Sequence, residues 1–325
     1  MTGAALRRRL DGLRLAPDGR PRPDAPTGQG PFAARVLGLV IRIAGAVVGR
    51  LPAGPVHAVA RAGGTVEWAA RPGKRRQLAE NLCHALGRPP TDEAVKRLVR
   101  REVVNEARRS VDFLWAVARP NELRRLTSVD GLEHILDALE DGQGVILASL
   151  HMGGWEVAAP VPAAAVPVPT TVLATDDWLA WAVARVRRDA GLRLLYDSEP
   201  PLRLVELLRR GEALLVLGDY AKPGMRTYRV RLLDAEVELA AGIGALARLA
   251  AAPIVPFVVL PEGPRRWRVT IEPAIPPPAR GSGREGEREA MQALADRWTA
   301  TIRAYPEHWA MVYPMTWHAA AEDEG

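Results

Sequence analysis

The chain has 325 residues, enough for one large α/β domain or two small ones, and its 48% hydrophobic content is that of an ordinary globular protein. The single cysteine, Cys83, excludes an internal disulfide and is expected to be a buried small hydrophobe in a reducing compartment. The net charge is +6, and residues 1–50 alone carry nine arginines against three aspartates. That surplus of nine minus three equals the net charge of the whole chain, which indicates an anionic partner for the N-terminal part.

We expect residues 1–30 to form a disordered basic tail, because this proline- and glycine-rich stretch cannot bury a core. A signal peptide is not expected, since the arginines are followed by prolines and acids instead of an apolar region. No zinc-finger, RNA-recognition or basic-zipper pattern accompanies the positive charge. A lipid surface is therefore the expected anionic partner, and nucleic acid is not.

The next stretch, residues 32–50, is apolar but interrupted by Arg42, and its uncharged runs fall short of the ~20 residues that a membrane-spanning helix needs. One interpretation is a helix that lies in the membrane interface, with Arg35, Arg42 and Arg50 on lipid phosphates. The other is an amphipathic helix that packs on the protein itself. The sequence leaves both open.

Helical periodicity continues through residues 71–86 and 92–117. These two helices carry a strongly basic face, which consists of Lys74, Arg75, Arg76, Arg97, Arg100, Arg101, Arg108 and Arg109. Such a face is usually solvated, but it could also meet acidic lipid headgroups or an acidic carrier protein. We expect residues 31–119 to form an N-terminal helical region.

After Pro120 helices and strands alternate. Strands are expected at 145–150, 170–173, 192–196, 213–217, 254–260 and 267–272, with a possible hairpin at 228–239. Helices are expected at 132–139, from 155, and at 177–190, 202–210, 240–251 and 284–305. This alternation predicts that residues 120–325 form an α/β fold with a mostly parallel central sheet flanked by helices.

A histidine and a glutamate follow the most apolar strand. His151 lies at its carboxyl end, where open α/β sheets place their active sites, and Glu156 lies just beyond the pair Gly153-Gly154. On one continuous helix the two side chains would diverge by roughly 140°. If the glycines break the chain, Glu156 can fold back, orient the imidazole and make His151 a general base. An ordinary satisfied polar pair is the competing interpretation.

A second buried strand ends at Gly218-Asp219, which would bring Asp219 to the same edge of the sheet as His151. A structural aspartate that caps the next turn is the alternative. The sequence lacks a G-x-S-x-G elbow, a G-x-G-x-x-G loop, a P-loop and an H-E-x-x-H motif. Its six histidines do not cluster at ligand spacing, so no metal is expected.

Several short motifs occur in an order that resembles a known family. They are Asn81-Leu82, Gly131-Leu132-Glu133, Gly144-Val145-Ile146-Leu147, His151-x4-Glu156, Arg188 before Gly191, Leu207–Gly211, Gly218-Asp219, Ala252–Pro256 and Pro306-Glu307-His308-Trp309. The chain resembles the lysophospholipid acyltransferase superfamily, in the branch of the late lipid A acyltransferases and the phosphatidylinositol mannoside acyltransferases. The resemblance covers residues 78–317.

The resemblance implies transfer of an acyl chain from a thioester to a hydroxyl of a membrane lipid. His151 would deprotonate the acceptor and Glu156 would orient the imidazole, without a covalent acyl-enzyme. Arg188, Asp219, Trp155 and Gly154 would bind substrate, and a guanidinium such as that of Arg188 suits a phosphate. No cofactor is implied, because acyl-CoA or an acyl carrier protein is a co-substrate. The implied location is the cytoplasmic face of the cell membrane, as a peripheral or monotopic protein. The resemblance further implies that residues 31–119 contact the membrane and that residues 120–325 are the catalytic core.

The chain departs from the family at Gly154, where asparagine is usual, and at Tyr220, where glutamine or arginine follows the aspartate. These differences affect the identity of the acceptor, which could be a glycolipid such as a phosphatidylinositol mannoside. Two alternatives to a transferase remain, a lipid ester or thioester hydrolase and a non-catalytic lipid-binding protein of the same fold. Acyl chain length, the donor carrier and the oligomeric state are left undetermined by the sequence.

Overall fold

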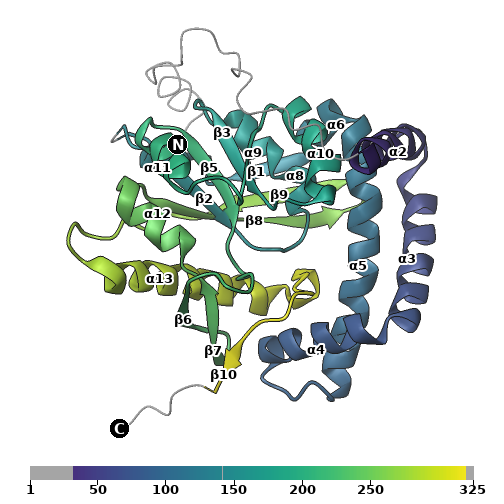
Figure 1. Ribbon diagram of the computed structural model, residues 1–325. Helices are drawn as coiled ribbons and strands as arrows, with labels where there is room; N and C mark the ends of the chain where they lie inside the picture. The colour runs from purple at the N-terminus through teal and green to yellow at the C-terminus, as the bar shows by residue number, and fades with distance from the viewer. Residues whose placement is uncertain (1–31, 141, 320–325) are drawn as a thin grey trace.

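The computed structural model describes residues 32–319 apart from Asp141, so the expected tail at residues 1–30 lies outside the described residues. Helices open the described chain and lead into the sheet (Figure 1). They are α2 (Phe32–Val48), α3 (Ala53–Ala70), α4 (Pro72–Leu86), α5 (Glu93–Ala118) and α6 (Pro120–Arg125). The helices expected at 71–86 and 92–117 are confirmed as α4 and α5. Asp92 caps α5, where its carboxylate accepts a hydrogen bond from the backbone N–H of Ala94 at 2.7 Å.

The central sheet has seven strands in the order β1-β9-β8-β2-β5-β3-β4. Every neighbouring pair is parallel except β8 and β9, which confirms the mostly parallel sheet. The strands are β1 (Thr127–Asp130), β2 (Val145–Ser149), β3 (Thr170–Ala174), β4 (Arg193–Tyr196), β5 (Ala213–Leu217), β8 (Ile254–Gly263) and β9 (Arg266–Ile271). The sequence pattern did not predict β1, a short strand at the edge of the sheet beside β9.

Helices cover both faces of the sheet. They are α7 (Leu132–Ala138), α8 (Trp155–Ala158), α9 (Pro160–Ala165), α10 (Trp178–Asp189), α11 (Leu202–Arg209), α12 (Gly242–Ala250) and α13 (Gly283–Ala304). Ile146 and Ala148 of β2 join a buried cluster with α12 and α13, whereas Val145 and Leu147 join a second cluster with α7 and α8. Because side chains alternate along a strand, β2 is buried on both faces, as its unbroken apolar run predicted.

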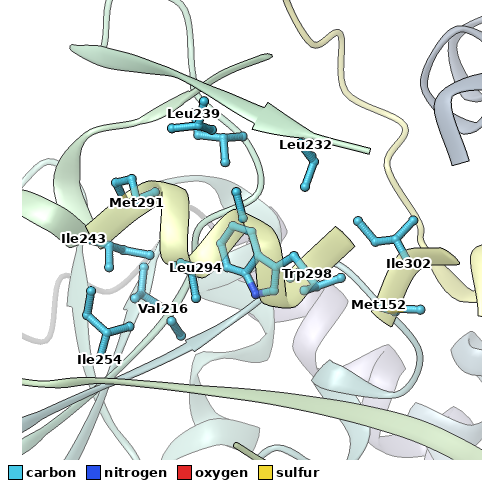
Figure 2. Close-up of a cluster of buried hydrophobic side chains, with 14 of the residues drawn as sticks. Met152, Val216, Leu232, Leu239, Ile243, Ile254, Met291, Leu294, Trp298 and Ile302 are labelled. Carbon is cyan, nitrogen blue, oxygen red and sulfur yellow. The ribbon is translucent and has the colours of Figure 1, made fainter. Parts of the chain in front are cut away.

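A smaller sheet lies on the far side of α13. It consists of β6 (Thr227–Leu232), β7 (Ala235–Ala240) and β10 (Trp317–His318), and the antiparallel pair β6 and β7 confirms the expected hairpin. Figure 2 shows Leu232 and Leu239 of the hairpin on one side of α13, and Val216 and Ile254 of the main sheet on the other. Helix α13 thus fills the space between the two sheets with apolar side chains.

The N-terminal helices share this core with the sheet. Leu78 and Leu82 of α4 and Val95 of α5 are buried in the same cluster as Ile146 of β2. Cys83 is also buried there, with 6% of its surface exposed, which confirms the small hydrophobe that was expected. The helical part that precedes the sheet is therefore packed against the catalytic core, while its contact with a membrane stays a prediction.

Helix α2 packs closely on one side and presents apolar side chains on the other. A Cβ at Gly38 would lie 2.9 Å from the carbonyl oxygen of Ala182 in α10, and one at Gly45 would lie 2.7 Å from that of Leu114 in α5. The exposed apolar residues of α2 are Phe32, Val36, Leu39, Val40, Ile43 and Val47. Within residues 32–319, no helix combines the length and hydropathy that crossing a bilayer requires.

Candidate active site

The loop after β2 is shaped by two adjacent glycines. Gly153 has a φ of +57°, and a Cβ there would lie 1.9 Å from the carbonyl oxygen of Val259, so this position excludes other residues. The backbone N–H of Gly154 donates to the same carbonyl at 2.9 Å. Strand β2 ends at Ser149, and the two glycines lead the chain into α8, as the sequence indicated.

Gly154 was expected to bind substrate, but it is buried against a core tryptophan. A Cβ at Gly154 would lie 2.7 Å from Cδ1 and 2.8 Å from Nε1 of Trp267. The indole of Trp267 thus occupies the space that a side chain at position 154 would need. Gly154 therefore has a packing role, because a side chain at this position would collide with the indole.

His151 and Asp219 come together at the edge of the sheet. Strands β2 and β5 are parallel neighbours in which Ser149 pairs with Leu217, and each polar residue lies two positions beyond its strand. Nδ1 of His151 lies 2.7 Å from Oδ1 of Asp219, and the backbone N–H of His151 donates to Oδ2 at 2.9 Å. The sequence predicted that these two residues share a site, and the structure makes Asp219 the hydrogen-bonding partner of the imidazole.

The electrostatic setting favours a protonated imidazole. Burial alone would lower the pKa of His151, but the charge of Asp219 and its hydrogen bond outweigh this, and Glu156 adds a smaller contribution in the same direction. The net effect raises the pKa of His151 above its ordinary value. A histidine with this partner can accept a proton and hold it as a stabilised imidazolium.

Glu156 occupies a different place from the one expected. Its Oε1 accepts a hydrogen bond from Nη2 of Arg187 at 3.1 Å, and Asp219 holds the Nδ1 position of His151. Glu156 was expected to contact the imidazole, and this expectation is wrong for Nδ1, where Asp219 makes the hydrogen bond. The physical reason is that α8 directs the Glu156 side chain toward α10, so its charge reaches His151 only through space.

Two further expected residues are placed as follows. Arg188 is exposed near the end of α10, and its neighbour Arg187 is the one that meets Glu156.

The ring of Trp155 packs edge-on against His151, with 5.5 Å between the centroids. On another side, Tyr313 also packs edge-on against His151 at 5.6 Å and stacks on Tyr220 at 4.5 Å. An aromatic wall formed by Trp155, Tyr220 and Tyr313 therefore borders the imidazole.

Sequence reasoning missed the roles of three residues. Trp309 donates its indole N–H to Oδ2 of Asp219 at 2.9 Å, Arg187 pairs with Glu156, and Tyr313 flanks the imidazole. Trp309 belongs to the motif Pro306–Trp309, which was noted without a role, and Arg187 adjoins the expected Arg188. No sequence pattern indicated that Tyr313 lies beside His151, because only the folded chain brings it to the edge of the sheet.

A cavity of about 540 Å³ lies beside this site, between α2, α5, α6, α8, α9 and α10. Apolar side chains such as Phe113, Val117 and Val157 line it, and Glu156 and Arg187 form part of its wall. Arg42 of α2, Arg50 just after that helix, and Arg119 also border it. Apolar walls with a few charged groups suit an amphiphilic ligand.

Pairing with an acid does not by itself distinguish His151. His57 pairs with Asp112 at 2.7 Å, His84 with Asp234 at 2.6 Å and His318 with Glu238 at 3.1 Å. The His151–Asp219 pair differs in its position, at the carboxyl ends of two central parallel strands. Ser149 points elsewhere, because its hydroxyl donates to the carbonyl of Phe257 at 2.8 Å, so it is not placed as a nucleophile.

A histidine–carboxylate pair at the carboxyl edge of a mostly parallel sheet is chemically able to take a proton from a hydroxyl or from water. Among the described residues, the imidazole forms its hydrogen bond with Asp219, and Ser149 is directed to Phe257. The family model "Bacterial lipid A biosynthesis acyltransferase" matches residues 33–316. The chain belongs to this family and is an O-acyltransferase of lipid biosynthesis.

Curated relatives agree with this assignment. The chain is 28% identical over 309 residues to a phosphatidylinositol mannoside acyltransferase of Mycolicibacterium smegmatis, covering 92% of this chain and 97% of the relative. It is 29% identical over 257 residues to a protein of the same name from Mycobacterium tuberculosis, covering 75% and 78%. A crystal structure of the 1-acyl-sn-glycerophosphate acyltransferase of Thermotoga maritima aligns with a TM-score of 0.35 and 11% identity, over 76% of this chain and 98% of that one.

Proposed function

We propose that this protein transfers a fatty acyl chain from an acyl thioester to a hydroxyl group of a membrane glycolipid, with His151 as the general base. The observation that carries the proposal is the His151–Asp219 pair at the sheet edge, 2.7 Å apart. Nε2 of His151 takes the proton of the acceptor hydroxyl, whose oxygen attacks the thioester carbonyl. The carbon–sulfur bond then breaks, and the imidazolium returns its proton to the leaving thiolate.

Asp219 fixes the imidazole and compensates its positive charge during this reaction. A carboxylate on Nδ1 sets the tautomer that leaves the Nε2 lone pair available, and it stabilises the imidazolium that forms. Glu156 supports the same charge from a greater distance, because its carboxylate also raises the pKa of His151. Its contact with Arg187 gives it a second role at the wall of the cavity.

The cavity between α2 and α10 receives an alkyl chain of the lipid in this proposal. Its walls are mainly apolar, and Glu156 connects it to the surroundings of His151. Arg42, Arg50 and Arg187 at its border suit a phosphate group, since guanidinium groups form paired hydrogen bonds with phosphate oxygens. Arg188, which is exposed, is a weaker candidate for this contact than Arg187.

The acceptor that we favour is a phosphatidylinositol mannoside. Two relatives carry the name phosphatidylinositol mannoside acyltransferase, one of them aligned over 92% of this chain, which supports a mannosylated lipid. The aromatic side chains of Trp155 and Tyr313 beside His151 offer apolar ring surfaces of the kind that fix ligand orientation.

The donor is either acyl-CoA or an acyl carrier protein, because the exposed guanidinium groups of Arg76, Arg97 and Arg101 on α4 and α5 suit both. Lys74 and Arg109 of the expected basic face do not contribute, since both are largely buried in ion pairs with glutamates.

We further propose that α2 lies on the cytoplasmic face of the membrane. Six exposed apolar residues on one helix, flanked by Arg35, Arg42 and Arg50, fit an amphipathic helix in an anionic interface. Docking through α2 would bring the neighbouring cavity to the bilayer surface, where the lipid acceptor is found.

Purified protein incubated with palmitoyl-CoA and a panel of lipids tests the proposal. The panel contains phosphatidylinositol, its mannosides and a lysophospholipid, and both acylated lipid and free fatty acid are followed. We expect acylated mannoside as the main product. Free fatty acid alone, at the same rate with and without lipid, would favour the hydrolase, in which His151 activates water.

If palmitoyl-CoA gives no product, the panel is repeated with acyl carrier protein that carries a palmitoyl group, before acyl transfer is rejected. Activity with only one carrier identifies the donor. Absence of turnover with both donors, together with mannoside binding, would favour the non-catalytic lipid-binding alternative.

A further inference from the structure

The segment of residues 306–313, here called the C-terminal segment, packs along the loop that carries His151. The backbone N–H of Ala310 donates to the carbonyl of His151 at 2.7 Å, and that of Gly153 donates to the carbonyl of His308 at 2.8 Å. Met152 and Trp309 form a β-bridge between these two contacts. The main chain from His151 to Gly153 is thereby held in place.

Trp309 reaches from this segment to the carboxylate of Asp219. Its side chain is fully buried, and its indole N–H donates to Oδ2 of Asp219 at 2.9 Å. The backbone N–H of His151 donates to the same oxygen, also at 2.9 Å. With Oδ2 held by two donors from different segments, the carboxylate cannot rotate freely, and Oδ1 remains directed at Nδ1 of His151.

We propose that Trp309 is a positioning residue for acyl transfer, whose indole N–H holds the Asp219 carboxylate in the orientation that makes His151 a base. This inference rests on the proposed function, because it assumes that the His151–Asp219 pair performs the chemistry. Trp309 acts through Asp219 and is separate from the substrate-binding groups.

Two outcomes follow when the indole N–H is lost. The carboxylate gains rotational freedom, so the base is correctly oriented for a smaller fraction of the time. The carboxylate of Asp219 also loses one hydrogen-bond donor. Its negative charge then attracts the imidazolium more strongly, which raises the pKa of His151. The other titratable groups around the ring are Glu156 of α8 and the phenols of Tyr220 and Tyr313, and Trp309→Phe alters none of them.

The chain offers a matched control in Trp298 of α13. Both tryptophans belong to the same buried cluster, and Trp298 is 2% exposed. Figure 2 shows Trp298 among the apolar side chains that fill the space beside the sheet. Its Nε1 is buried without a hydrogen-bond partner among the described residues, so Trp298→Phe removes similar packing and no contact with Asp219.

The test compares Trp309→Phe with Trp298→Phe in acyl transfer to the lipid acceptor over a range of pH. For Trp309→Phe we expect kcat to fall about 10-fold, KM to change less than about 2-fold, and the acidic limb of the pH profile to move to higher pH. For Trp298→Phe we expect lower thermal stability with an unmoved acidic limb. A Trp309→Phe enzyme that loses stability alone, with wild-type kcat and pH profile, would overturn the proposal.

A double-mutant cycle gives a second readout. If Trp309 acts through Asp219, Trp309→Phe changes kcat by less than about 2-fold in the Asp219→Asn background. Fully additive losses would contradict the proposal. If Trp309→Phe does not fold, the NMR resonance of the indole N–H proton of Trp309 is followed in the wild type over a range of pH. This resonance must shift with the ionisation seen in the acidic limb of the pH profile, while the resonance of Trp298 stays constant.

Different results would refute the proposed function and the positioning role of Trp309. Full activity of His151→Ala would refute the proposed function and, with it, the premise of this inference. Loss of activity in His151→Ala together with an unaltered Trp309→Phe enzyme would refute the inference alone.

Discussion

The Glu156 carboxylate accepts a hydrogen bond from Arg187 at 3.1 Å, whereas the imidazole five residues earlier in the chain pairs with Asp219 at 2.7 Å. The acid nearest in sequence to His151 is thus not the one on its Nδ1. This arrangement separates two roles that the motif His151-x4-Glu156 would assign to one carboxylate. In the proposed reaction, Asp219 orients the base, and Glu156 acts by charge and by its contact with Arg187.

The first prediction compares the two acids. Asp219→Asn should lower kcat by at least about 10²-fold, because an amide can neither stabilise the imidazolium nor enforce the same tautomer. Glu156→Gln should cost clearly less in kcat, since the hydrogen bond on Nδ1 remains. Steady-state kinetics with the lipid acceptor measures both variants. A larger loss in Glu156→Gln than in Asp219→Asn would return the orienting role to Glu156.

The second prediction concerns the exposed apolar face of α2. Ile43 is 57% exposed there, and Ile43→Glu should weaken binding to vesicles that contain anionic lipid by about 10-fold or more, because the interface no longer gains an apolar side chain and now repels a charge. Leu202→Glu on α11 is the control, since Leu202 is 70% exposed at a site away from α2. Vesicle sedimentation measures the effect. Equal losses in both variants would refute docking through α2.

The third prediction concerns Gly154. Gly154→Asn should lower the free energy of unfolding by on the order of 2 kcal/mol, because the new Cβ would lie 2.7 Å from the indole of Trp267. Gly63→Ala is the control, since a Cβ at that exposed helical position meets no atom within 4 Å. Chemical denaturation measures both. A fully stable Gly154→Asn protein would show that Trp267 can move aside, and that substrate contacts explain the glycine instead.

The fourth prediction is a pH dependence of stability at His308. Burial lowers the pKa of His308 to about 4, the charges of Arg108 and Arg109 act in the same direction, and Glu307 opposes them. Its Nδ1 is buried without a hydrogen-bond partner among the described residues. Between about pH 6.5 and pH 4 the unfolded chain therefore binds a proton at this residue that the folded protein does not.

The free energy of unfolding should consequently fall as the pH is lowered through that window, by about 3 kcal/mol in total from this residue. His308→Gln removes the titration, so the stability difference between wild type and variant should change by that amount between pH 7 and pH 4 and be constant at higher pH. Denaturant titrations at several pH values measure it. A difference that does not vary with pH would contradict the lowered pKa of His308.

The sequence predicted most of the fold because its strands and helices are marked locally. The unbroken apolar run of β2 and its glycine borders predicted an interior parallel strand, and the same reasoning located β5. The strand β1 was missed, because its four residues have no periodicity of their own and are stabilised by pairing with β9. Helix α2 was predicted as a helix, but its packing against α5 and α10 through glycines depends on tertiary contacts.

The site was predicted only in part, for a similar reason. His151 and Asp219 could be found because both follow buried strands, and parallel strands bring their carboxyl ends to one edge. Which acid reaches the imidazole depends on strand register and on the direction of α8, and spacing along the chain reveals neither. Trp309 lies 90 residues from Asp219, so only the folded chain shows that its N–H meets that carboxylate.

The most direct test of the central claim is the rate of acyl transfer by His151→Ala, with His84→Ala as the matched control. His84 also pairs with an aspartate, at 2.6 Å from Asp234, but it lies on α4 away from the sheet edge. General base catalysis by His151 predicts a loss of at least about 10²-fold in kcat for His151→Ala and a nearly unchanged rate for His84→Ala. Acyl transfer by a folded His151→Ala protein at a rate close to wild type would contradict general base catalysis by His151.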